Sequence, residues 1–198
     1  SSQISALSTT GIMGLTASMI QGMTQTQLSG ITATQMNSLT TTEIDSLSTS
    51  QIAALSTQQI QALNRAQIRS LSTDQLGALT TSQFAALTPS QMGNLTATEL
   101  TSLSATQLQQ ITPAQFGGLN GEQISAMTSA QIAMLTATQI SGITPTTIAT
   151  WSQSVMDALT EKSFEFDALN ATQIRAFTTT QLSTMTPAQL AALSRALA

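Results

Sequence analysis

The chain has 198 residues, a net charge of −4 and only 7% charged residues, against roughly 25% in an ordinary soluble domain. Without Cys or His, it lacks thiolate nucleophiles, disulfides, histidine bases and the usual zinc and haem ligands. Its few basic residues form no stripe for nucleic acid, and no apolar run approaches the roughly 20 residues that span a bilayer. We therefore predict a chain that is not an enzyme, with no cofactor, metal, nucleic-acid partner, membrane span or small-molecule substrate.

The apolar residues make up 41% of the chain, and they follow an eight-residue period. One series of bulky residues runs from Leu7 to Leu159, and a second runs three residues earlier, from Ile4 to Met156. This much regularly spaced apolar surface argues against disorder. The sequence is therefore a tandem array of octads, and the repeat decides the predicted architecture.

Each octad carries the signals of a helix start. Ser, Thr or Asn follows every residue of the first series, and these residues are preferred N-caps. Gln or Glu stands three residues after the cap from Gln27 to Gln139, and again at Gln173, Gln181 and Gln189, which is the capping-box pattern. All four prolines directly follow a cap, at the first helical position. We predict one short helix of about seven residues per octad.

Such short helices are unstable alone, so neighbouring octads must stack. The predicted fold is all-α, a solenoid or superhelix of very short capped helices, with three or four octads in each coil. Two other architectures fit the repeat less well. In a continuous α-helix each octad would be rotated by about 80° from the previous one, so the apolar residues would be distributed around the helix instead of forming one stripe. A β-solenoid requires apolar residues at every second position, and this alternation is absent.

The array is predicted to form a single domain over residues 1–198, with regular octads in 1–159 and 170–198. An irregular ten-residue unit at 160–169 separates them, because two extra residues shift the next cap to Asn170. Thr160 and Ser194 are also expected to be caps. The irregular unit holds the densest charge in the chain and follows Trp151, the only tryptophan, which is predicted to fill an inward slot.

Two interpretations of the irregular unit stay open: a tolerated bulge, or a weak partner-binding spot. The residues of the second interpretation are Trp151, Glu161, Phe164, Glu165, Phe166 and Asp167, and Glu161, Glu165 and Asp167 could form a cation site. The repeated Gln residues likewise have two interpretations. They are helix caps, or they form rows that contact a regular partner such as a glycan or an ice lattice.

Runs such as Leu39-Thr-Thr-Thr-Glu-Ile-Asp-Ser-Leu47 and Leu55-Ser-Thr-Gln-Gln-Ile-Gln-Ala-Leu63 resemble octapeptide arrays of very long bacterial secreted or cell-surface proteins, often described as adhesins or haem-utilisation exoproteins. The resemblance implies an extracellular or cell-surface location. Our first hypothesis is a structural rod, spacer or filament-forming segment, which self-associates end to end or is flanked by domains of a longer chain. The alternative is an adhesin-like module that binds a protein, a glycan or ice through its Thr, Ser and Gln faces.

Overall fold

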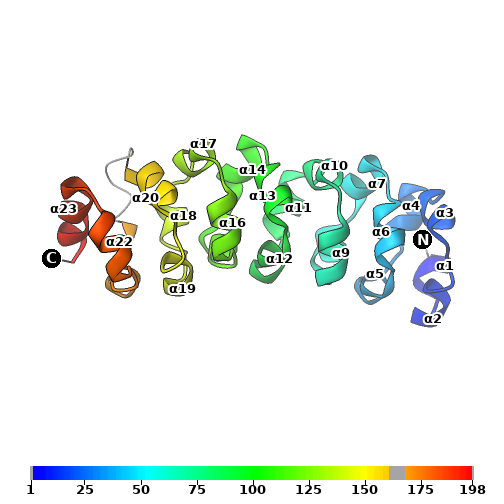
Figure 1. The fold of residues 1–198 in the computed structure, drawn as a ribbon. Helices are drawn as coiled ribbons and strands as arrows, with labels where there is room; N and C mark the ends of the chain where they lie inside the picture. Colours follow the sequence, from blue (N-terminus) through cyan, green and yellow to red (C-terminus); the bar gives the residue numbers. More distant parts are fainter. Residues whose placement is uncertain (1, 161–167, 198) are drawn as a thin grey trace. The chain divides into compact units, whose positions relative to one another are not determined.

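The computed structural model describes residues 2–160 and 168–197, and all regular secondary structure in this part of the chain is helical (Figure 1). The predicted all-α class is thereby confirmed for the described residues. The chain forms two compact units, Ser1–Leu95 and Thr96–Ala198. The helices of the first unit are α1 (Ser2–Ser5), α2 (Thr9–Ile12), α3 (Ala17–Gln21), α4 (Gln25–Leu28), α5 (Ala33–Ser38), α6 (Thr41–Asp45), α7 (Thr49–Ala54), α8 (Thr57–Gln61), α9 (Arg65–Ser70), α10 (Thr73–Gly77), α11 (Thr81–Ala86) and α12 (Pro89–Asn94).

The second unit contains the helices that follow Leu95. They are α13 (Ala97–Thr101), α14 (Ala105–Gln110), α15 (Pro113–Gly117), α16 (Gly121–Ala126), α17 (Ser129–Ala133), α18 (Ala137–Ile140), α19 (Pro145–Ile148), α20 (Gln153–Thr160), α21 (Ala171–Ile174), α22 (Thr179–Thr184) and α23 (Pro187–Ala196).

The predicted caps set the start of the helices. Ser56, for example, has extended backbone angles of φ −74° and ψ 159°, and its side chain accepts a hydrogen bond from the Gln59 N–H. An extended residue interrupts the helical backbone, so each cap ends one helix and directs the chain into the next. The four prolines lie at the starts of α12, α15, α19 and α23, which confirms the predicted phase.

The helices of the regular octads are shorter than predicted. From α2 to α19 they contain four to six residues instead of about seven. The last positions of the octad form a C-terminal turn, as at Ala62, whose N–H donates to the carbonyls of Gln58 and Ile60. Part of each octad is therefore used to turn the chain before the next cap.

Two predicted caps are wrong. Helix α20 extends to Thr160, and helix α23 continues through Ser194 to Ala196. The Ser194 hydroxyl donates to the Leu190 carbonyl at 2.9 Å. A serine that hydrogen-bonds back to the carbonyl four residues earlier is accommodated inside a helix, so α23 does not stop there.

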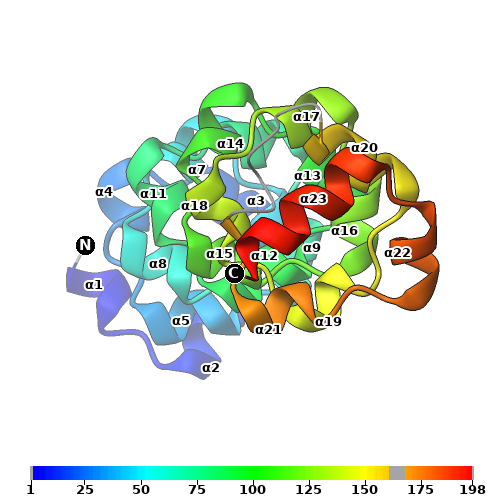
Figure 2. The same cartoon turned by 90° about the vertical axis from the view of Figure 1, so that its left-hand side faces the viewer.

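Within each unit, helices three octads apart lie against each other. In the first unit α2, α5, α8 and α11 are successive neighbours, as Figure 2 shows for α5, α8 and α11. In the second unit the same relation holds for α13 with α16, α15 with α18, and α17 with α20. We call the stretch of three to four octads that brings the chain back beside itself a coil. This arrangement is consistent with the predicted solenoid.

Both apolar series form the interior of the units. The second series is no more than 3% exposed from Ile12 to Met156, and the first is no more than 6% exposed from Ile31 to Leu159. Each of these octads therefore contributes two side chains to the core of its own unit. Since burial of one such side chain stabilises by about 1.5–3 kcal/mol, packing between coils stabilises helices that would not form alone.

Candidate functional site

The polar chemistry that recurs from octad to octad is concentrated in the glutamine side chain, and Gln59 shows the geometry. Its Oε1 accepts from the backbone N–H of the cap residue Ser56 at 2.8 Å. The Ser56 hydroxyl accepts in turn from the Gln59 N–H at 3.2 Å, which completes the capping box. The Nε2 of the same amide donates to the carbonyls of Leu28 and Ile31 at 2.7 and 2.8 Å. One side chain thus caps its own helix and joins it to the preceding coil.

This double use of the amide recurs in both units, and we call the set of side chains the glutamine ladder. Its members with such a hydrogen bond to a carbonyl of an earlier coil within the same unit include Gln35, Gln51, Gln59, Gln67, Gln75, Gln83, Gln91, Gln131, Gln139, Gln173, Gln181 and Gln189. All of them are buried. The cap interpretation is confirmed, and these buried amides are not displayed to an external lattice.

Sequence reasoning missed the half of the ladder that links coils. A capping box accepts Gln or Glu equally, so the preference for Gln at this position was the signal that a donor is needed. Only Glu43 and Glu99 replace it between Gln27 and Gln139. The acceptor carbonyls lie 28 and 31 residues before the glutamine in the first unit, as for Gln67, and the octad period alone does not specify that distance.

Glu43 stands at the octad position of the ladder glutamines but has no amide group to donate a hydrogen bond. It is 4% exposed, and its Oε2 accepts from the Thr40 N–H at 2.7 Å, so it caps α6. A carboxylate offers only acceptors. The register of Gln35 and Gln51 places the carbonyls of Ile12 and Leu15 opposite it, and these carbonyls receive no side-chain donor from Glu43. The amide link of the ladder is therefore absent at this octad, where the Ser46 hydroxyl donates to the Ala17 carbonyl of the preceding coil at 3.2 Å.

We expect Glu43→Gln to stabilise the first unit by about 1 kcal/mol, the net value of a typical intramolecular hydrogen bond. The new Nε2 would donate to the opposing carbonyls while Oε1 keeps the cap. Thermal and denaturant unfolding of the full chain measure the change. Glu122→Gln, at an exposed position of α16, is the control and should change stability by only a few tenths of a kcal/mol. An unchanged or lower midpoint for Glu43→Gln would contradict the ladder.

Trp151 fills an inward slot, as predicted. It is 4% exposed, and its ring meets Phe177 edge to face at 5.9 Å between centroids. Its indole N–H is buried without an acceptor among the described residues. The other residues of the candidate binding spot lie outside the described residues: Glu161, Phe164, Glu165, Phe166 and Asp167.

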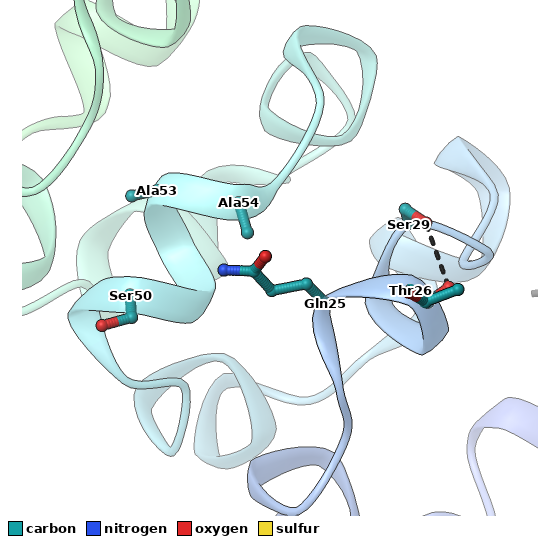
Figure 3. A pocket seen from close by; sticks show the side chains of 6 residues that line it. All are labelled: Gln25, Thr26, Ser29, Ser50, Ala53 and Ala54. Atoms are coloured by element: carbon teal, nitrogen blue, oxygen red, sulfur yellow. Dashed lines mark hydrogen bonds between the residues drawn. The ribbon is translucent and has the colours of Figure 1, made fainter.

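Shallow surface depressions recur at one position of the repeat. In Figure 3 one of them, with a volume of about 480 Å³, is lined by side chains of α4 and its C-terminal turn on one side and of α7 on the other. Gln25 extends across it towards Ala54. Equivalent depressions pair Thr41 and Thr42 with Ser70, and Gly121 and Glu122 with Thr150. The lining is small and mostly uncharged.

Two further observations limit the chemistry of the described residues. No group of three or more His, Cys, Asp or Glu residues that could hold a metal ion occurs among them. No described helix is long and apolar enough to cross a membrane.

The sequence was also compared with known proteins. The family model of the ALTTAQ repeat matches residues 57–89 and 165–195. These segments are similar to a described repeat family, which supports the repeat character of the chain. No curated protein and no solved structure gives a significant match.

Proposed function

We propose that the chain is a structural repeat protein, a rod, spacer or filament-forming segment of a bacterial secreted or cell-surface protein, and that it is not an enzyme. The observation that carries the proposal is the glutamine ladder. The glutamine side chain that recurs in the octads is buried, and its amide hydrogen-bonds to an earlier coil, as at Gln59 and Gln139. Because the same kind of hydrogen bond joins successive coils, an array of octads can be lengthened by adding further octads.

The surface and composition support the same function. The exposed positions carry mainly Ser, Thr, Ala and Gln, and the charged residues are few. A chain without Cys does not depend on the redox state of its surroundings, and few charged residues leave few sites for trypsin-like cleavage. The resemblance to octapeptide arrays of exported proteins favours an extracellular or cell-surface location. Attachment to flanking domains or to further copies would complete such a rod.

Small-angle X-ray scattering of the full chain tests the rod. A globular domain of this length has a radius of gyration of about 16 Å, and we expect a clearly larger value together with an elongated distance distribution. Circular dichroism must show helical structure under the same conditions, so that an unfolded chain is not mistaken for a rod. A helical particle with the globular radius would overturn the proposal.

A second candidate, the adhesin-like binding module, is favoured by the recurring depressions. Their regular placement between neighbouring coils, as in Figure 3, would present the same polar contacts repeatedly to a glycan, a protein or ice. Binding to a glycan array or inhibition of ice recrystallisation would support this function. The variant Ala53→Arg, which fills one depression with a bulky side chain, should then weaken the binding.

A further inference from the structure

The glutamine of the ladder is missing from two successive octads of the second unit. Thr147 stands at the ladder position of α19, and Val155 stands at that of α20. The helices before them, α17 and α18, both begin with a capping box, which requires Gln or Glu at this position. Glu43 and Glu99, by contrast, are single replacements with a glutamine in the octad on either side. Two neighbouring helices therefore start without the paired hydrogen bonds of the box.

The links from these two helices to the preceding coil are also fewer. Gln139 of α18 donates to two carbonyls of that coil, at 2.7 and 2.9 Å. The Thr147 hydroxyl donates to one, the Leu119 carbonyl, at 3.2 Å. Val155 has no polar atom in its side chain and donates to none. The side-chain links of the ladder thus decrease from two at α18 to one at α19 and none at α20.

Trp151 lies between α19 and α20 in the chain and adds a cost to the packed arrangement. Its side chain is buried, and its indole N–H has no acceptor in the part of the chain that the structure describes. A buried donor without a partner destabilises the structure that buries it, and water satisfies such a donor on exposure. Separation of this segment from its neighbours therefore removes one unfavourable contribution while it breaks favourable contacts.

Apolar packing and the following coil hold the segment in place. Met156 and Leu159 are buried, and α20 lies against α17. Gln181 donates to the Trp151 carbonyl and Gln189 to the Met156 carbonyl, as elsewhere in the ladder. The deficit of hydrogen bonds is on the side of the preceding coil, where the ladder amides are missing.

We propose that residues 145–160, which contain α19 and α20, form a local opening segment. This segment separates from the preceding coil and unfolds while the rest of the second unit stays helical. Helices of four and eight residues do not persist without packing, so separation and loss of helix occur together. The opening follows from hydrogen bonds within one unit and holds whether or not the chain is a rod. It allows the array to yield at one place without unfolding of the whole unit.

Hydrogen exchange of the full chain, measured by mass spectrometry, tests the opening against a matched segment of the same unit. Peptides from 145–160 report on α19 and α20, and peptides from 129–140 report on α17 and α18, which keep their capping boxes. After correction for intrinsic rates, we expect the amides of 145–160 to exchange roughly tenfold faster, because each missing hydrogen bond makes opening easier. Equal or slower exchange in 145–160 would overturn the proposal.

Variants at positions 139 and 155 exchange the properties of α18 and α20. Val155→Gln supplies the missing amide and should slow the exchange of α20, whereas Val155→Leu stays apolar and should not slow it. Gln139→Val removes both links of α18 to the preceding coil and should raise its exchange to the rate of α20. Circular dichroism shows whether each variant is folded. If a folded Gln139→Val chain exchanged at the original rate in α18, the ladder would not control local opening and the proposal would fail.

Trp151 is the only tryptophan of the chain, and its fluorescence reports on the same segment without any substitution. The emission and the helical circular dichroism are followed together as denaturant is added to the full chain. Local opening predicts that the emission shifts to longer wavelength, and that acrylamide quenches it, at denaturant concentrations that leave most of the helical signal. Coincident transitions of the two signals would mean that the segment unfolds only together with its unit, and the proposal would be wrong.

Discussion

Gln59→Met is expected to lower the free energy of unfolding by about 2 to 4 kcal/mol, since each buried polar group left unpaired costs about 1–3 kcal/mol. Methionine keeps the length and apolar stem of the side chain but neither accepts from the Ser56 N–H nor donates to earlier carbonyls. The Leu28 carbonyl would still accept from the Ile31 N–H at 3.0 Å. The Ser56 N–H and the Ile31 carbonyl would be left without the partners that Gln59 provides. Denaturant unfolding followed by circular dichroism measures the loss.

The neighbouring residue supplies the matched control. Gln58 is exposed, and its side chain accepts a hydrogen bond from the Thr57 hydroxyl of the same octad, so Gln58→Met should change stability by no more than about 0.5 kcal/mol. Gln59→Glu separates the two halves of the amide, because glutamate keeps the cap and loses only the donor. Its cost should fall between those of the other two variants. Equal costs for Gln58→Met and Gln59→Met would refute the role of the ladder.

The local features of the fold could be predicted from the sequence because their signals lie within one octad. The Ser56 cap, the Gln59 capping box and the apolar pair around them are set by neighbours a few residues away. The inward slot of Trp151 follows from the same period. Such features depend on residues only a few positions apart, and the same arrangement of residues recurs from octad to octad.

Features that depend on the stacking of coils could not be predicted in this way. The acceptors of the Gln59 amide lie 28 and 31 residues earlier, a separation that is not a property of one octad. The Phe177 ring that meets Trp151 lies beyond the irregular unit, where the phase is broken. Ser194 has the residue type and phase of a cap, yet its hydroxyl is used inside α23. In each case the outcome depends on which atoms a neighbouring segment presents.

Gly142→Ala is expected to destabilise the second unit by about 3 kcal/mol, the upper end of the usual cost of overpacking. Gly142 directly precedes Ile143, after α18, and packs against Pro113 at the start of α15. A Cβ atom there would overlap the Pro113 carbonyl oxygen and lie 2.5 Å from its carbonyl carbon. Backbone atoms cannot move aside as a flexible side chain can, so α15 and α18 would have to separate.

Gly77→Ala is the matched control for this close approach. Gly77 is the last residue of α10, is exposed, and has nothing within 4 Å of an added Cβ. Alanine has a higher helix propensity than glycine by up to about 1 kcal/mol, so Gly77→Ala should be neutral or stabilising. Thermal unfolding of both variants gives the comparison. If Gly142→Ala were as stable as Gly77→Ala, coils of the second unit would not approach each other as closely as α15 and α18 do, and the stacking of octads there would be wrong.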